Sequence, residues 1–292
     1  MTFPNEAPDL AVDEATYDRR RLRQWLSGEA RADGVARRDL LRMLTAAGLA
    51  TGISAAIPAT ARASTPSPST AGSTSAPLSV PGIVKPLPTE WFTERGTNAE
   101  TNFASLAHTG HHTPVSHFFV RNHTSTPHLD PATWSLKVWG SGLSAEGRDF
   151  TLADLRRLPA VTRSSFLECA GNGRSYFTSQ QGQTVTGTAW TLGAVGSARW
   201  RGARLADVLR LAGLRRGAVD VLPRGLDPDY VTADGTNLGR VRRPLPVAKA
   251  LDDVILAYEM NGAPLPPDHG APVRLIVPSW IGIASIKWVG DI

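Results

Sequence analysis

A single cysteine, Cys169, is the feature that most restricts what this chain of 292 residues can fold into. One thiol cannot form an intrachain disulfide, so a hydrophobic core must stabilise the fold. Apolar residues make up 41% of the sequence and eight residues are tryptophan, which suffices for such a core. The length allows one large domain or two small ones. One thiol also argues against zinc and iron–sulfur sites, which need several soft ligands.

The cysteine lies at the edge of a glycine-rich turn. The β-branched and apolar residues 161–167 predict a strand, and Gly171 and Gly173 allow the tight backbone that follows. Cys169 is therefore expected at a strand end, facing a cleft. Arg174 and free backbone N–H groups would favour the thiolate, which is the form that attacks an electrophile or binds a metal. The alternative is a buried cysteine with a structural role.

Three chemistries can use such a cysteine. A Cys/His hydrolase would pair Cys169 with His269, although no protease signature surrounds the cysteine. A metal site made by the protein alone would need ligands from a group of histidines, namely His108, His111, His112 and His117. Their spacing fits no standard zinc site. A metal held mainly by an organic cofactor needs only one protein thiolate.

The N-terminal part of the chain differs in composition from the rest. Residues 1–36 are polar and charge-mixed, which predicts a disordered lead. Residues 37–63 begin with Arg37-Arg38, continue with an apolar run and end in Ala61-Arg62-Ala63, a pattern that resembles a twin-arginine export signal. A Ser/Thr/Pro linker is predicted over 64–84. The folded domain is therefore expected to span 85–292.

These features predict a protein exported by the twin-arginine machinery to the periplasm or another extracytoplasmic space. Two alternatives stay open: an amphipathic helix with two surface arginines, and an uncleaved signal that anchors the protein in the membrane, because the apolar run approaches the length of a span. The net charge is +5 and the pI is about 9.8. Since Lys and Arg are spread along the chain, nucleic-acid binding is not expected.

From Lys85 onward the sequence predicts many short strands and few helices. Strands are expected at 115–120, 134–138, 161–167, 219–222, 254–260, 284–288 and in a segment ending at 277. Thr151 and Asp154 form a capping-box pattern for a short helix, and apolar spacing predicts a second helix over 205–212. Asn261-Gly262 marks a hairpin turn. The pattern is typical of an α+β domain.

Several separated motifs, in one order, resemble those of the sulfite oxidase family. They include Phe118–His123, the cysteine loop Phe166–Arg174 and the turn Arg224–Asp227, and the similarity covers roughly residues 88–292. The resemblance implies an α+β, mixed-sheet domain that binds molybdopterin.

The resemblance also implies roles for individual residues. Cys169 is the molybdenum ligand, and Arg121, Arg174 and Trp190 line the oxyanion pocket as catalytic residues. The residues implied to bind the cofactor are Phe119, Val120, Arg121, Asn122, His123, Cys169, Asp227, His269, Arg274, Ser285, Ile286 and Lys287. Permanent cations suit both the phosphate of the pterin and an anionic substrate, and the planar fork of arginine suits tetrahedral oxyanions.

The implied protein is an exported molybdenum–molybdopterin enzyme without haem or flavin, which transfers an oxygen atom to a small sulfur oxyanion. The expected reaction is oxidation of sulfite to sulfate, with electrons passed to an extracytoplasmic carrier of the cytochrome c type. The alternatives are a reductase of S-oxides or N-oxides on the same fold, a cofactor-free exported binding protein, and the Cys/His hydrolase.

Some positions depart from animal members of the family. Gly173 replaces the first of two arginines that follow the asparagine of the cysteine loop, and Thr186 stands where those members have lysine. A less cationic pocket is therefore expected. The sequence stops at Ile292, whereas family members continue into an immunoglobulin-like dimerisation domain that also brings a substrate-site tyrosine. The family dimer domain is therefore expected to be absent, which predicts a monomer with slow sulfite turnover.

Overall fold

The computed structural model describes residues 82–292, all of which belong to the compact unit Ser75–Ile292. The predicted lead (1–36), the twin-arginine segment (37–63) and most of the linker (64–84) lie outside the described residues. At the end of that linker, the carbonyl of Gly82 accepts a hydrogen bond from the N–H of Thr126 (2.9 Å). No helix within residues 82–292 is long and apolar enough to cross a membrane.

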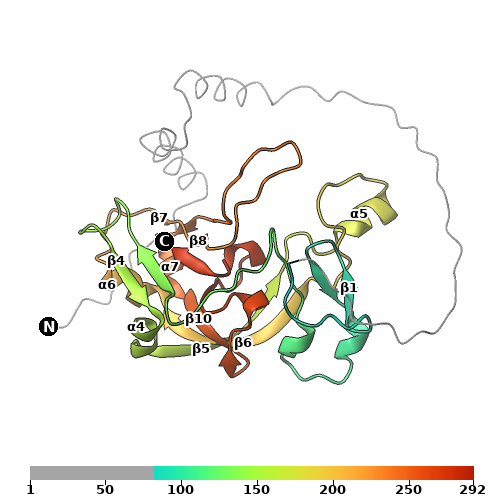
Figure 1. Ribbon diagram of the computed structural model, residues 1–292, viewed down its shortest axis with the longest axis horizontal. Helices are drawn as coiled ribbons and strands as arrows, with labels where there is room; N and C mark the ends of the chain where they lie inside the picture. Colours follow the sequence, from blue (N-terminus) through green and yellow to red (C-terminus); the bar gives the residue numbers. More distant parts are fainter. Residues whose placement is uncertain (1–81) are drawn as a thin grey trace, which may run out of the picture. The chain divides into compact units, whose positions relative to one another are not determined.

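Short strands make up most of the regular structure (Figure 1). The strands are β1 (Phe92–Glu94), β2 (Ala99–Thr101), β3 (Ser135–Val138), β4 (Arg148–Thr151), β5 (Ala160–Glu168), β6 (Val195–Arg204), β7 (Asp220–Val221), β8 (Arg224–Gly225), β9 (Leu245–Pro246), β10 (Ile255–Met260), β11 (Ala263–Pro264), β12 (Arg274–Ile276) and β13 (Val289–Asp291). The α-helices are α4 (Leu152–Arg157), α5 (Arg174–Gln181), α6 (Leu205–Leu211) and α7 (Val247–Asp252). The 3₁₀ helices are η2 (Phe103–Leu106), η3 (Val115–His117), η4 (Pro267–His269) and η5 (Gly282–Ala284).

Two larger sheets carry these elements. In the first, β5 pairs antiparallel with β6 along all nine of its residues, β10 pairs with the other edge of β6, and β11 and β12 both pair with β10. The second sheet has the order β4-β3-β13-β8, and its β3–β13 pair is parallel while the other pairs are antiparallel. The prediction of an α+β domain with mixed sheets is therefore confirmed.

The core follows from the alternation of apolar residues. In β3, Leu136 and Val138 are buried while Ser135 and Lys137 are exposed, as expected for a strand with one face on the core. A large apolar cluster covers this face and includes the buried side of α6. A second cluster, around Phe118, Trp190 and Trp200, lies behind the end of β5 where Cys169 follows.

Local signals are confirmed where they are strongest. The hydroxyl oxygen of Thr151 accepts a hydrogen bond from the N–H of Asp154 (3.1 Å), and the carboxylate of Asp154 accepts one from the N–H of Thr151 (2.9 Å), which completes the capping box of α4. Asn261 and Gly262 have φ values of 53° and 87°, as a two-residue hairpin turn requires.

Two strand predictions are wrong. Residues 115–117 form η3 because the ammonium group of Lys85 donates to the carbonyl oxygens of Val115, Ser116 and Phe118, which an extended strand would point in different directions. Ala284 ends the 3₁₀ helix η5, residues 285–288 are irregular, and the strand β13 begins only at Val289. Trp288 has φ of 50°, a left-handed conformation that no strand contains.

Candidate active site

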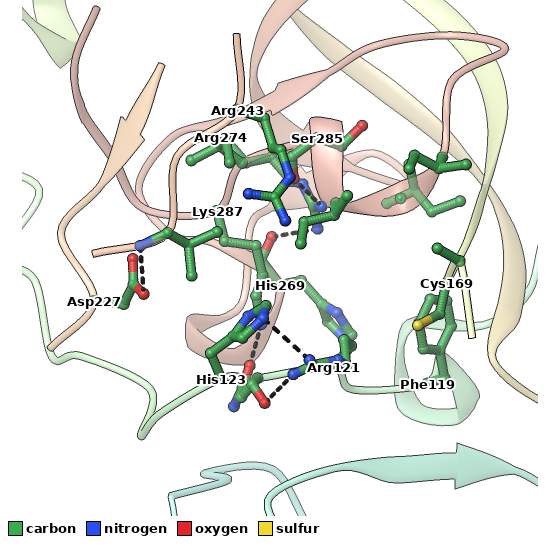
Figure 2. Close-up of a pocket in the computed structure, with 18 of the residues that line it drawn as sticks. Phe119, Arg121, His123, Cys169, Asp227, Arg243, His269, Arg274, Ser285 and Lys287 are labelled. Carbon is green, nitrogen blue, oxygen red and sulfur yellow. Dashed lines mark hydrogen bonds between the residues drawn. The ribbon is translucent and has the colours of Figure 1, made fainter. Parts of the chain in front are cut away.

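One cavity of about 310 Å³ lies beyond the carboxyl end of β5. Figure 2 shows Cys169 and Phe119 at one end of it and Asp227 at the other, with His123 between them. All but two of the residues that the sequence assigns to the site line this cavity, namely Phe119, Arg121, Asn122, His123, Cys169, Arg174, Asp227, His269, Arg274, Ser285, Ile286 and Lys287. Chain segments far apart in sequence therefore meet as the motifs predict.

Val120 and Trp190 are not on the cavity wall. The backbone of Val120 forms a bridge to Ala99, and its side chain is buried in a separate apolar cluster. Trp190 is fully buried and meets the ring of Phe119 edge-on, with ring centroids 6.3 Å apart. Trp190 therefore supports Phe119 from behind, whereas Val120 belongs to the neighbouring apolar cluster.

The backbone around Cys169 is fixed by hydrogen bonds. Its N–H donates to the carbonyl of Ala194 (2.9 Å), and its own carbonyl accepts from the N–H of Asn172 (2.8 Å). The side-chain oxygen of Asn172 accepts a further bond from the N–H of Ala194 (3.1 Å). The N–H of Gly171 lies 3.4 Å from the Cys169 sulfur. The loop therefore fixes the backbone of Cys169, and the N–H of Gly171 faces its sulfur.

Arg121 lies between the cysteine and His123. Its guanidinium donates to the backbone carbonyl of Asn122 and contacts Nε2 of His123 (3.2 Å). Burial lowers the pKa of Arg121, and the charge of Cys169 opposes that shift. Burial and the neighbouring Arg121 also lower the pKa of His123 to about 4, so this imidazole is neutral near pH 7 and its Nε2 can accept the arginine N–H.

Two glycines, Gly171 and Gly187, leave the space that the side chain of Arg174 occupies. Its guanidinium donates to the carbonyl of Thr188 (3.0 Å). A Cβ atom at Gly171 would lie 2.7 Å from the guanidinium, and one at Gly187 would lie 2.6 Å from it. Any side chain at either position would occupy this space. The glycine-rich turn therefore serves to admit Arg174 as well as to bend the backbone after Cys169.

Two basic side chains and one histidine occupy the interior of the cavity. Arg274 donates to the carbonyls of His269 (3.0 Å) and Ser285 (2.8 Å), and burial lowers its pKa to about 9. The ammonium of Lys287 donates to the side-chain oxygen of Asn122 and to a backbone carbonyl, and burial, reinforced by Arg274, lowers its pKa well below the usual value. Burial does the same to the pKa of His269, whose Nε2 has no hydrogen-bond partner among residues 82–292.

Few carboxylates offset these cations. Burial raises the pKa of Asp227, which accepts a hydrogen bond from the N–H of Val241 (3.3 Å). Asp268 accepts from the N–H groups of Val84 and Lys85 and from the hydroxyl of Thr126. No carboxylate of the described residues forms a salt bridge with a cation that lines the cavity. Since buried charges need partners, the cavity is built for anionic groups.

Sequence reasoning missed Asp268 and Arg243, which also line the cavity. Asp268 directly precedes His269, which the sequence assigns to the site, so its position was available from the sequence. Arg243 lies in the run Arg240–Arg243, and such arginines are usually exposed surface charges. Only the fold shows that one of them, Arg243, reaches the cavity while its side chain stays exposed at the rim.

The upstream histidines contact other groups. His112 lies 2.9 Å from the hydroxyl of Ser164, and His117 stacks on Trp91 with ring centroids 4.1 Å apart. Within residues 82–292, no three His, Cys, Asp or Glu side chains are grouped so that they could hold a metal ion. A metal at Cys169 therefore needs ligands from outside the described part of the protein.

Comparisons with known proteins agree with this geometry. Residues 123–292 match the family described as oxidoreductase molybdopterin binding domain. Human mitochondrial sulfite oxidase is 44% identical over 185 residues, which cover 62% of this chain and 32% of that protein. Sulfite oxidase of Arabidopsis thaliana is 36% identical over 201 residues, which cover 67% of this chain and 50% of that protein.

Among solved structures, the sulfane dehydrogenase SoxCD from Paracoccus pantotrophus aligns with a TM-score of 0.56 and 31% identity. The alignment covers 69% of this chain and 48% of that one. The chain thus spans about a third of the human enzyme and about half of the structural relative.

Proposed function

The chain belongs to the sulfite oxidase family of molybdopterin-binding oxidoreductases, and on that premise we propose that it transfers an oxygen atom to sulfite, giving sulfate. The single observation that carries the proposal is the placement of one thiol and two arginines, Arg121 and Arg174, on the same cavity wall. Sulfite is a small dianion, and two forked cations beside the reacting centre suit it.

The side chains of the cavity fit a molybdenum–pterin cofactor. A single thiolate is a suitable soft ligand when an organic dithiolene supplies the rest. Buried Arg274 and Lys287 and the unpartnered Nε2 of His269 are donors without an anionic partner in the described residues, as a phosphate-bearing pterin requires. Cys169 would hold the metal, and these three residues would hold the pterin and its phosphate.

The bound cofactor supplies two-electron oxygen-transfer chemistry, which no protein side chain offers. The protein binds and orients the reactants. Arg121 and Arg174 attract the oxyanion and fix its sulfur toward the Cys169 end, and their charges stabilise the negative charge that is redistributed during reaction. Neutral His123 accepts an N–H of Arg121 and so holds that guanidinium in one orientation. Phe119, Leu167 and Ile283 form an apolar wall that limits water.

The test is a steady-state assay on metal-loaded, full-length protein with ferricyanide or cytochrome c as electron acceptor. Sulfite-dependent reduction of the acceptor is the expected result. Reduction of S-oxides or N-oxides by an added electron donor, with no response to sulfite, would contradict the proposal. A cytochrome c-type carrier as the physiological acceptor is part of the proposal, and comparison of the two acceptors tests it.

Sulfane sulfur is a second candidate substrate. It is favoured by the similarity to the sulfane dehydrogenase structure and by the apolar residues Ile281 and Ile283 on the cavity wall. A protein-bound or organic persulfide would be tested in the same assay. Faster turnover of the persulfide than of sulfite would move the assignment to this substrate.

Export by the twin-arginine route is also part of the proposal. It rests on Arg37-Arg38, the apolar run and Ala61-Arg62-Ala63, all outside the described residues. This route carries folded proteins, which suits an enzyme that receives its cofactor before export.

A further inference from the structure

The loop that joins β8 to β9, residues 226–244, brings an unassigned side chain to the cavity. Figure 1 shows this loop, in orange, projecting from the body of the structure. Its base is fixed by a hydrogen bond from the N–H of Gly225 to the carbonyl of Val241 (2.9 Å). Tyr230 meets the ring of His123 edge-on, with centroids 5.8 Å apart. The loop therefore packs through Tyr230 against His123, a residue of the cavity wall.

Arg243 extends from the end of this loop into the cavity (Figure 2). Its backbone N–H donates to the carbonyl of Pro223 (3.3 Å), which fixes the residue at the rim. One guanidinium N–H donates to the carbonyl of Arg242 (2.9 Å), and no carboxylate within residues 82–292 forms a salt bridge with it. A guanidinium has five N–H donors, so most of its donors are available to a ligand.

Arg243 adds to a group of cations on one side of the cavity. In Figure 2, Arg243, Arg274 and Lys287 all lie on the side away from Cys169. Asp227 is also on that side, and a second carboxylate that lines the cavity, Asp268, is already bonded to Val84, Lys85 and Thr126. Arg243 lies near His123, because after burial and Arg121 its charge is among those that lower the pKa of that imidazole. Three cations against two carboxylates, one of which already accepts three hydrogen bonds from its neighbours, favour an anionic ligand on this side of the cavity.

We propose that Arg243 binds the phosphate group of the pterin cofactor together with Arg274 and Lys287, on the side of the cavity remote from Cys169. This inference rests on the proposed function. Arginine suits the task because its planar fork can donate two parallel hydrogen bonds to phosphate oxygens. The loop 226–244 then contributes to cofactor binding through Arg243 at its end.

The chain offers a matched control for this test. Arg242 is adjacent, equally charged and, like Arg243, exposed to solvent, but it does not line the cavity. Arg243→Ala, Arg243→Lys and Arg242→Ala are made in the full-length chain. Binding of inorganic phosphate to the cofactor-free proteins is measured by calorimetry. Loss of molybdenum and of pterin fluorescence from the loaded proteins is then followed during dialysis.

We expect Arg243→Ala to weaken phosphate binding by about 10- to 100-fold, the range for losing a hydrogen bond between charged groups. Arg243→Lys keeps the positive charge but lacks the planar guanidinium, so its phosphate affinity should lie between those of wild type and Arg243→Ala. Arg242→Ala should stay within about twofold of wild type, as surface substitutions do. Loaded Arg243→Ala should also release molybdenum and pterin faster than wild type.

Equal phosphate affinity and equal cofactor release in Arg243→Ala and wild type would overturn the inference while leaving the proposed function intact. Equal losses in the Arg242 and Arg243 variants would also overturn it, because the effect would then be general electrostatics. A wild type that holds no molybdenum contradicts the proposed function and the assignment to a pterin phosphate. The phosphate titration then still decides whether Arg243 binds a phosphate group.

Discussion

Gly171→Ala should displace Arg174 and leave the fold in place. The added methyl group would lie 2.7 Å from three atoms of the Arg174 guanidinium, closer than non-bonded contact allows. The guanidinium ends a flexible side chain, so it moves and the backbone does not. Gly171 is not among the residues with positive φ, so alanine brings no backbone strain there.

The expected change in the free energy of unfolding is small, whereas the expected loss of kcat/KM is large. The variant loses the hydrogen bond from Arg174 to Thr188, worth about 0.5–1.5 kcal/mol. Replacing glycine by alanine recovers about 0.4–1 kcal/mol from the unfolded state, so the net change in stability is within about 1 kcal/mol. A guanidinium displaced from the anion loses a charged hydrogen bond, which lowers kcat/KM for sulfite about 10- to 100-fold.

Thermal unfolding, molybdenum content and kcat/KM for sulfite are measured together. Gly217→Ala is the control, because no atom lies within 4 Å of its added Cβ and its φ is not positive. If Gly171 acts through Arg174, the double variant Gly171→Ala/Arg174→Ala should be no slower than Arg174→Ala alone. Normal kcat/KM in Gly171→Ala, or additive losses in the double variant, would refute the reasoning.

Three further predictions use different groups. Cys169→Ser should abolish sulfite turnover with little change in thermal unfolding, because a hydroxyl is a poor soft-metal ligand; near-normal turnover would exclude a metal-ligand role. Burial lowers the pKa of His123 to about 4 from 6.5, so the unfolded chain binds more protons between these values. The free energy of unfolding of the cofactor-free chain should therefore fall as pH drops through that range, and His123→Gln should reduce this slope in urea titrations; an unchanged slope would contradict the cause. Changing Arg37 and Arg38 to lysine should leave the precursor in the cytoplasm, and mature protein outside the cell in fractionation would contradict a twin-arginine signal.

Much of the framework was predictable because its determinants are local. The strand before Cys169, the capping box at Thr151 and the turn at Asn261-Gly262 depend on neighbouring residues, and the structure has all three. The residues of the cavity wall come from segments far apart in the sequence, so they were predictable only through the order of motifs that resembles the family.

The errors arise where a distant residue decides the conformation. Val115–His117 is apolar enough for a strand. However, the ammonium group of Lys85, about 30 residues earlier in the chain, donates hydrogen bonds to the carbonyls of Val115 and Ser116. Trp190 resembles a pocket residue, but its indole turns into the core behind Phe119. Arg243 carried no signal at all, because its direction depends on a loop anchored by backbone hydrogen bonds.

The central claim is that Cys169 ligates a molybdenum cofactor in this cavity. X-ray absorption at the molybdenum edge tests it most directly, on full-length wild type and on Cys169→Ser purified in the same way. The account predicts molybdenum in the wild type with one more sulfur ligand than in the serine variant. Identical sulfur coordination in the two proteins, or a wild type without molybdenum, would contradict it.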